Sequence, residues 1–260
     1  MERHDAFRVT NSVSLNEALG VRRGDVVTLT GGGGKTAALL RLSRELPAAG
    51  LRVLATTTTH AEASVEDAVP VVRVGPGIES RLAAALAGGG AVFLAAGRTA
   101  DGKLAGVAPE DIDALAALGV ADVIVVEGDG SRRRPLKAPA AHEPVVPSSS
   151  TIVSFVMGID ALGEPLDGPL VHRPELVRAF GGPSVTVELM ASLAASPRAG
   201  LKGAPTAAAA RPIVNKAAGA RRADAETVAA AVLAFERPQI DRALVTDIAT
   251  SSFAVVARRR

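Results

Sequence analysis

The stretch Thr30-Gly-Gly-Gly-Gly-Lys-Thr36 decides the fold of this chain. An apolar run at residues 26–29 precedes it and predicts a buried strand, and leucines at helical spacing in residues 37–46 predict a helix after it. A strand, a glycine loop and Lys-Thr at the start of a helix form the context in which a glycine run cradles phosphate. A flexible glycine hairpin is the alternative, but a hairpin has no need of Lys-Thr there. We therefore predict a loop that binds nucleotide phosphates.

Each residue type in this loop has a separate task. Glycines let the backbone come close to a polyphosphate and turn N–H groups toward it, and the helix N-terminus adds partial positive charge. The lysine, expected on an exposed loop, reaches the terminal phosphates, and the threonine hydroxyl holds Mg²⁺. The predicted phosphate contacts are Gly31, Gly32, Gly33, Gly34, Lys35 and Thr36, with Lys35 also catalytic and Thr36 also a metal ligand.

The spacing of the loop departs from the commonest phosphate-loop pattern. The pattern G-x-x-x-x-G-K-S/T requires a glycine at position 29, where this chain has Leu29. The shorter spacing Gly31-x-x-Gly34-Lys35-Thr36 fits instead and resembles the loop of Mur-type peptide ligases. Phosphate binding therefore stays the prediction, while an ordinary GTPase or ATPase motor becomes a weaker one.

Strand and helix patterns alternate along the chain. Strand patterns occur at residues 26–29, 51–55, 70–74, 91–96, 123–126, 151–156, 211–216, 243–246 and 253–257. Helix patterns occur at residues 14–19, 37–46, 78–87, 109–118, 186–195 and 224–235, with a short one after Pro174. This alternation predicts a P-loop-type α/β fold, a mostly parallel sheet flanked by helices, as a single domain over residues 1–260. Residues 1–24 are expected to be a lead-in with one short helix, residues 97–107 and 132–147 to be loops, and the C-terminal half to be less regular, with room for a small lobe within 160–210.

The composition excludes several classes of function. The 260 residues include no Tyr, no Trp and six Phe, so the chain lacks the aromatic rings on which single-stranded nucleic acids stack. A net charge of +2 is too balanced for a dedicated polyanion binder. The absence of cysteine excludes disulfides, Fe–S ligation, thiolate zinc sites and cysteine nucleophiles. No apolar run has membrane-spanning length and no leader pattern follows the first residues, so we expect a cytoplasmic protein without nucleic-acid or membrane partners.

Acidic and hydroxyl side chains follow two of the predicted strands. Glu127 and Asp129 come directly after residues 123–126, and the threonines of residues 56–59 end another strand. Because ligands lie beyond the carboxyl ends of parallel strands, these segments should meet the glycine loop in one crevice. An acid in that position holds Mg²⁺ directly or through water. We assign Glu127, Asp129 and Thr57 to the metal, and Asp129 also to catalysis; a simple glycine-aspartate turn and β-branched strand filler are the alternatives.

Basic and histidine residues could complete the crevice. A basic run beyond Asp129 comprises Arg132, Arg133, Arg134 and Lys137. Such a run is often a solvated surface, but beside a polyphosphate we expect at least one arginine to meet phosphate or an acidic substrate, and we take Arg132 as the catalytic candidate. His60 could be a switch or a surface residue. The pairs His142-Glu143 and His172-Arg173 could serve a second ligand or could be buried polar pairs, and both alternatives stay open.

These motifs occur together in one known family. The chain resembles the YqeC family of selenium-dependent hydroxylase accessory proteins in residues 31–36, 56–60, 127–139, 142–144 and 171–174, in that order. The match runs over nearly the whole chain, and the segment 127–144 is its most specific part. The resemblance implies a P-loop-type nucleotide-binding protein that accompanies molybdenum-containing hydroxylases and helps to mature them or their cofactor. Without cysteine, any role in selenium transfer would be indirect, and the enzyme served could be an ordinary molybdenum hydroxylase.

The resemblance also suggests which residues contact the nucleotide base. The family strand near position 215 tends to read Asn-Lys-x-Asp, and we carry over Asn215 and Lys216 as nucleotide contacts. This chain has Ala218 where that pattern has the aspartate that accepts hydrogen bonds from guanine. We therefore expect ATP to bind at least as well as GTP.

Three kinds of function are compatible with these features. The first is an enzyme that uses ATP or another nucleoside triphosphate with Mg²⁺ for hydrolysis or phosphoryl transfer, with Mur-like activation of a small acid as a variant. The second is a nucleotide-gated chaperone or adaptor for an apo-hydroxylase. A third, weaker one is a small-molecule kinase whose acceptor lies near His142 and Glu143. Steady turnover without a partner favours the enzyme, whereas turnover only with an apo-hydroxylase favours the adaptor.

Overall fold

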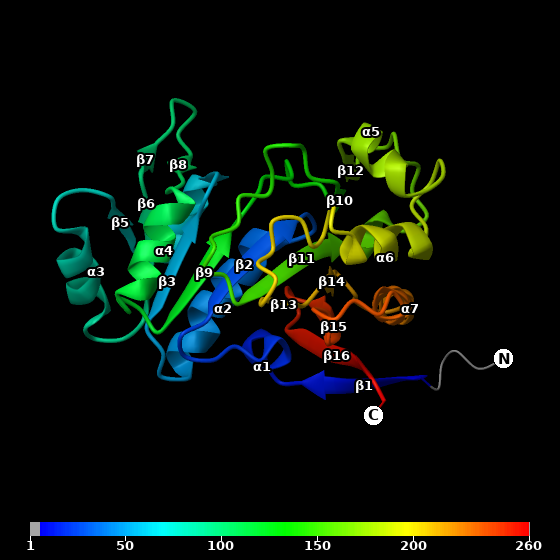
Figure 1. Cartoon of the computed structure of the whole chain (residues 1–260), viewed down its shortest axis with the longest axis horizontal. Helices are drawn as coiled ribbons and strands as arrows, with labels where there is room; N and C mark the ends of the chain where they lie inside the picture. Colours follow the sequence, from blue (N-terminus) through cyan, green and yellow to red (C-terminus); the bar gives the residue numbers. More distant parts are fainter. Residues whose placement is uncertain (1–5, 260) are drawn as a thin grey trace.

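The computed structural model describes residues 6–259 and shows a large mixed sheet with helices on both faces (Figure 1). The part of the expected lead-in at residues 1–5 lies outside the described residues. The main sheet has 11 strands in the order β1-β16-β15-β14-β11-β2-β9-β3-β6-β5, with β13 paired to β11. The strand bounds are β1 Phe7–Ser12, β2 Val26–Gly31, β3 Val53–Thr57, β5 Val71–Arg73, β6 Ala91–Ala95, β9 Val123–Glu127, β11 Ile152–Gly158, β13 Ala209–Ala210, β14 Ile213–Asn215, β15 Arg242–Asp247 and β16 Ser252–Arg258.

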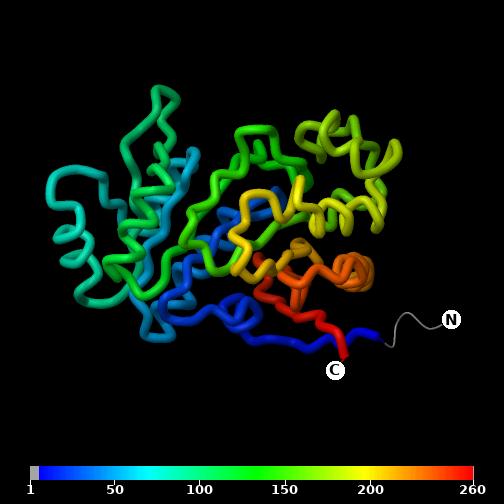
Figure 2. The backbone as a smooth tube through the Cα atoms, viewed as in Figure 1, coloured from blue at the N-terminus to red at the C-terminus, as the bar shows by residue number. Residues whose placement is uncertain are grey.

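The predicted mostly parallel sheet is confirmed. All neighbouring pairs from β5 to β15 run parallel, and only β16 and β1 are antiparallel to their neighbours. The prediction of a lead-in over residues 6–13 is wrong, because β1 pairs with β16 along its whole length. Figure 2 shows the blue and red ends of the backbone running side by side along this outer edge.

Helices cover the sheet in two layers. On one face lie α1 (Leu15–Leu19) and α2 (Lys35–Ala48); on the other lie α3 (Ile78–Leu86), α4 (Pro109–Ala117), α6 (Val187–Ala195) and α7 (Arg221–Leu233). Side chains alternate along each strand, so Val27 and Leu29 of β2 pack toward α1 and α2, whereas Val26 packs toward α3 and α4. Both faces of the central strands are therefore buried, as the continuous apolar runs predict.

Shorter elements decorate the sheet. The prediction of a loop over residues 97–107 is wrong, because β7 (Gly97–Arg98) and β8 (Leu104–Ala105) form a hairpin, which β4 (His60–Ala61) joins in a small antiparallel sheet. We call residues 97–106 the finger. The remaining short elements are η2 (Ala63–Asp67), β10 (Leu136–Lys137), η3 (Ile159–Ala161), β12 (Val171–His172), α5 (Pro174–Val177) and η4 (Arg178–Phe180). A separate lobe within 160–210 stays a prediction.

The carboxyl ends of the central strands meet at one edge of the sheet. Strand β2 lies between β11 and β9, and β3 lies on the other side of β9. The glycine loop after β2, the threonines after β3 and the acidic loop after β9 are thus neighbours, as expected. Within the described residues, no helix is both long and apolar enough to span a membrane.

Candidate nucleotide-binding site

The glycine loop is packed tightly against the protein behind it. A Cβ atom on Gly33 would lie 2.2 Å from the backbone nitrogen of Gly158, and one on Gly32 would lie 2.5 Å from the Arg134 carbonyl oxygen. Gly33 and Gly34 also adopt φ angles of 71° and 125°, which favour glycine. The glycines are therefore required by close backbone contact as well as by the turn.

Backbone N–H groups of the loop divide into two sets. Those of Gly31, Gly32 and Gly33 donate to the Asp129 carboxylate, the Val156 carbonyl and the Arg134 carbonyl, at 3.1, 2.8 and 3.2 Å. The later ones lie at the N-terminus of α2, where no side chain caps the helix and the bond from Ala38 N–H to the Gly34 carbonyl closes the first turn. The N–H groups of residues 34–37 precede that bond and offer an anion site.

Lys35 is buried, so the expectation of an exposed loop lysine is wrong. Only 3% of the residue is exposed. Its Nζ donates to the Gly31 carbonyl at 2.6 Å and lies 3.3 Å from Asp129 Oδ1 and 3.8 Å from Glu127 Oε1. The two acids from the end of β9 compensate the buried ammonium, which explains its burial.

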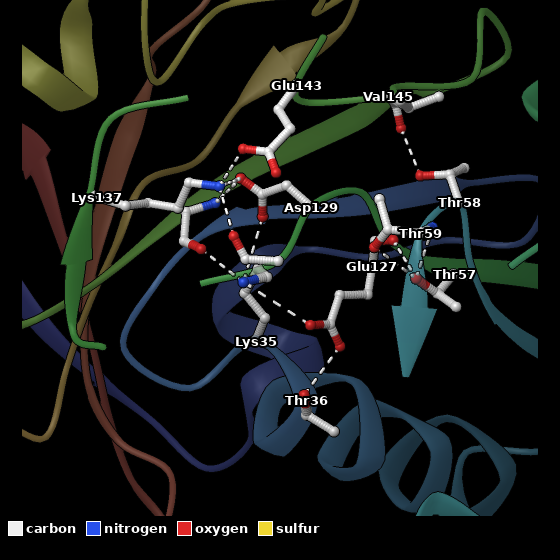
Figure 3. Close-up of polar contacts among 12 residues, drawn as sticks. Lys35, Thr36, Thr57, Thr58, Thr59, Glu127, Asp129, Lys137, Glu143 and Val145 are labelled. Atoms are coloured by element: carbon white, nitrogen blue, oxygen red, sulfur yellow. Dashed lines mark hydrogen bonds and ion pairs between the residues drawn. The ribbon is translucent and has the colours of Figure 1, made fainter. Parts of the chain in front are cut away.

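Thr36 and Glu127 form the other contact between the loop and β9. The Thr36 hydroxyl donates to Glu127 Oε2 at 2.9 Å (Figure 3). Burial raises the pKa of the Glu127 carboxyl, although Lys35 and the Thr36 hydroxyl act against it. A hydroxyl and a carboxylate at this distance are oxygen ligands of the kind that Mg²⁺ prefers. Within residues 6–259, no three His, Asp or Glu side chains gather into a metal-binding cluster.

A row of alternating charges extends from the loop to Glu143 and Arg173. Lys137 is fully buried, and its Nζ lies 2.9 Å from Asp129 Oδ2, 2.7 Å from Glu143 Oε2 and 2.6 Å from the Gly130 carbonyl (Figure 3). Beyond Glu143, Arg173 Nη1 lies 2.5 Å from the same Oε2. We call the set Glu127, Lys35, Asp129, Lys137, Glu143 and Arg173 the ion-pair row. The ion-pair row connects the glycine loop to the segments 142–144 and 171–174.

The charges at the Glu143 end of this row shift the pKa values of Glu143 and His172. Burial raises the pKa of Glu143, but the hydrogen bonds and charges of Lys137 and Arg173 outweigh burial and lower the pKa to about 2. Burial and the nearby cations, Arg173 first, lower the pKa of His172 to about 4, so its imidazole is neutral at physiological pH.

The threonines and His60 take different positions from one another. Thr57 is fully buried, and its hydroxyl donates to the Glu127 carbonyl at 2.9 Å, which ties β3 to β9. Thr58 and Thr59 line the pocket in front of the loop, as does the exposed His60. The structure thus directs Thr57 into the sheet and its two followers toward the pocket; the metal role of Thr57 stays a prediction.

The basic run also divides. Arg132 and Arg133 line the pocket, whereas Arg134 donates to the Val171 carbonyl at 2.5 Å and Lys137 lies in the ion-pair row. The expectation that at least one arginine meets phosphate therefore stays a prediction for Arg132 and Arg133, the two that line the pocket.

Asn215 and Lys216 lie on the opposite side of the loop. The Asn215 amide donates to the Gly33 carbonyl at 2.8 Å and accepts from the Thr246 hydroxyl at 3.0 Å. Lys216 lines the pocket and pairs with Asp160 at 2.6 Å. Asn215 thus connects the glycine loop to the ends of β14 and β15.

One pocket of about 830 Å³ gathers most of these side chains. Predicted site residues on its wall are Gly33, Gly34, Lys35, Thr36, Glu127, Arg132 and Lys216, together with His60, His142 and Glu143. Gly31, Gly32, Thr57, Asp129 and Asn215 lie behind this wall and hold it in place. Sequence reasoning missed Glu62 and Lys103 as wall residues, because no motif marks them, and missed the buried role of Lys137, for which its apolar neighbours Leu136 and Ala138 were a signal.

Comparisons with known proteins agree with the resemblance seen in the motifs. The family model described as YqeC protein matches residues 27–175, which include the glycine loop and the 127–144 segment. The uncharacterised protein YqeC of Escherichia coli (strain K12) is 37% identical over 188 residues, covering 71% of this chain and 73% of that protein. A structure of the signal recognition particle receptor FtsY from Elizabethkingia anophelis covers 88% of this chain at 14% identity and a TM-score of 0.39, and this chain spans 63% of that protein; we draw nothing from a likeness of this size. With a family model over more than half of its length and a relative of this identity, the chain belongs to the YqeC family.

Proposed function

We propose that this protein binds a nucleoside triphosphate with Mg²⁺ and hydrolyses it or transfers its terminal phosphoryl group. One observation carries the proposal: at the uncapped N-terminus of α2, Lys35 and Thr36 lie 3.8 and 2.9 Å from the Glu127 carboxylate on the wall of a pocket of about 830 Å³. An anion site, a buried ammonium, a hydroxyl and a carboxylate are the groups that phosphoryl chemistry requires.

The side chains divide this work between them. The N–H groups at the start of α2 and the Lys35 ammonium bind phosphate oxygens. Thr36 and Glu127 would hold the metal, and Mg²⁺ when bound offsets negative charge on the phosphates. Asp129 lies behind Lys35 and positions its ammonium. Arg132, exposed on the pocket wall, offsets charge that grows on the transferred group.

The family relationship supports a finer proposal about the pathway. The resemblance to the YqeC family associates the protein with the maturation of molybdenum hydroxylases, including selenium-dependent ones. That part rests on the resemblance alone, because the pocket geometry names no partner enzyme. Turnover separates the enzyme from the adaptor: steady phosphate release without an apo-hydroxylase supports the enzyme, and release only in its presence supports the adaptor.

Calorimetric titration with ATP, with and without Mg²⁺, tests nucleotide binding. Lys35→Ala should weaken ATP binding about tenfold or more, since a hydrogen bond to a charged group contributes roughly 1.5–3 kcal/mol. Because Lys35 is buried, Thr36→Val serves as a second variant that removes only the hydroxyl and should reduce the gain from Mg²⁺. Arg44→Ala is the control, since it removes an exposed charge from the same helix away from the pocket. ATP affinity unchanged in a folded Lys35→Ala protein would refute the proposal.

A further inference from the structure

The pocket extends beyond the glycine loop into a space between two other segments. One is the loop after β9, with residues 130–133 and 142–145, and the other is the finger with the neighbouring β4. Figure 1 shows the finger strands β7 and β8 projecting at the same edge of the sheet as the loop after β9. We call the residues of this space the distal subsite: His60, Glu62, Lys103, Arg133, His142 and Glu143.

The finger wall of this subsite is fixed to the sheet. The Gly106 N–H donates to the Thr59 carbonyl at 2.7 Å, and the Val107 N–H donates to the Thr57 carbonyl at 2.9 Å. A Cβ atom on Gly106 would lie 2.5 Å from the Thr57 carbonyl oxygen, so only glycine permits this approach. The segment that follows β8 is therefore held at the carboxyl end of β3, and Lys103 directly precedes β8.

Apart from Glu143, the distal subsite holds two cations and one carboxylate. Arg133 and Lys103 both approach Glu62, at 3.2 and 4.0 Å. Lys103 has a second acid, Asp101, at 3.5 Å, but Asp101 does not line the pocket. Two cations thus share one wall carboxylate, and each keeps donors for an anion between them.

The backbone presents Arg133 to the pocket in an unusual conformation. Arg132 and Arg133 have consecutive φ angles of 50° and 60°, in the left-handed region that non-glycine residues rarely adopt. Both flanks of this turn are anchored, because the Gly130 carbonyl accepts from buried Lys137 at 2.6 Å and the Arg134 guanidinium donates to the Val171 carbonyl. The turn thus fixes the backbone from which Arg133 lines the pocket, with 84% of its side chain exposed and its donors accessible to a ligand.

Glu143 supplies a second kind of contact. Its side chain is about nine-tenths buried, and both Lys137 and Arg173 bind the same oxygen, Oε2. Its Oε1 has no partner among residues 6–259, while the residue lines the pocket; Figure 3 shows one carboxylate oxygen of Glu143 joined to Lys137 and the other without a dashed line. An ionised carboxylate with one open oxygen accepts a hydrogen bond from a hydroxyl group.

We propose that the distal subsite binds a second small molecule, which carries an anionic group for Arg133 and Lys103 and a hydroxyl group for Glu143. The proposal rests on the proposed function, since it places this molecule beside a nucleotide held by Lys35 and Thr36. The anionic group is a carboxylate or a phosphate, both of which match the donors of arginine and lysine.

The test is a titration of the protein saturated with Mg²⁺ and a non-hydrolysable ATP analogue. The probes are inorganic phosphate, malonate and hydroxymalonate, which separate phosphate from carboxylate and show the effect of one added hydroxyl. We expect the wild type to bind phosphate or malonate, and the probe that binds more tightly identifies the anionic group as phosphate or carboxylate. We also expect hydroxymalonate to bind at least threefold more tightly than malonate, because its hydroxyl group can donate to Glu143. Equal affinity for malonate and hydroxymalonate would remove Glu143 from the proposal.

Matched variants locate the binding. Lys103→Ala with Arg133→Ala should weaken probe binding at least tenfold and leave affinity for the ATP analogue unchanged. Arg22→Ala with Arg44→Ala, two exposed arginines outside the pocket, is the control and should change neither. No probe binding to the nucleotide-saturated wild type, or equal binding in the Lys103/Arg133 variant, would overturn the proposal. A separate titration with the ATP analogue alone tests the proposed function. If the analogue does not bind at all, the proposed function is refuted.

Discussion

Replacing Lys137 by methionine tests whether the ion-pair row stabilises this fold. Methionine keeps most of the volume of the lysine side chain and removes its ammonium. The substitution leaves Asp129 with Lys35 at 3.3 Å and the Gly31 N–H at 3.1 Å, and leaves Glu143 with Arg173 alone. Removing one partner of a buried ion pair costs roughly 3–5 kcal/mol, because the other charge stays buried. We expect the free energy of unfolding to fall by about that amount.

The assay is urea unfolding at pH 7, supported by thermal melting. For a chain of this length each kcal/mol corresponds to roughly 2–4 °C, so the melting temperature should fall by about 6–20 °C. Lys202→Met is the matched control: its Nζ donates to the Ala140 and Ala141 carbonyls at 2.6 and 3.0 Å and has no acid partner among the described residues. The control should lose only about 0.5–1.5 kcal/mol. A Lys137→Met protein within 1 kcal/mol of the wild type would refute the reasoning.

Three further predictions concern the metal, the base and pH. Glu127→Gln should remove much of the gain in ATP affinity that Mg²⁺ gives, because Glu127 contacts Thr36 on the pocket wall; an equal Mg²⁺ effect in wild type and variant, measured by calorimetry, would contradict this. ATP should bind at least as well as GTP in a competition titration with ATP, GTP and CTP, since position 218 is alanine, and a tenfold preference for GTP would show that another residue reads guanine. The folded-state pKa of Glu143 is lowered to about 2, so its stabilising contribution is present above an ordinary pKa near 4.5 and is lost as pH falls toward 2. Glu143→Gln should therefore destabilise most above pH 4.5, and a stability difference that grows on acidification would contradict the assignment.

Most of the sheet could be predicted because its strands carry their own signal. Strands β2, β9 and β11 are buried on both faces, so each reads as an apolar run between turn residues. Strand β1 gives no such signal, since its middle residues are exposed and its pairing with β16 depends on the far end of the chain. The two-residue strands of the finger are too short for any periodic pattern.

The gathering of these side chains at one pocket could be predicted, but their burial could not. Lys35, Thr36 and Glu127 follow from the loop motif and from the acid at the end of a strand. The burial of Lys35 depends on acids that arrive from β9, and the burial of Lys137 depends on Asp129 and Glu143. Lysine side chains are usually exposed, and these two are buried because acids distant in the sequence pair with them.

The ion-pair row also has a consequence for protons. Lys35 serves Glu127 and Asp129 together, so a phosphate that draws its ammonium away leaves Glu127 with less compensation. Burial already raises the pKa of Glu127, and weaker contact with Lys35 raises it further. We therefore expect Glu127 to take up a proton when ATP binds without Mg²⁺, and a metal ion held by Glu127 would take the place of that proton. The heat of binding should consequently depend on the ionisation enthalpy of the buffer in the absence of Mg²⁺ and lose that dependence in its presence.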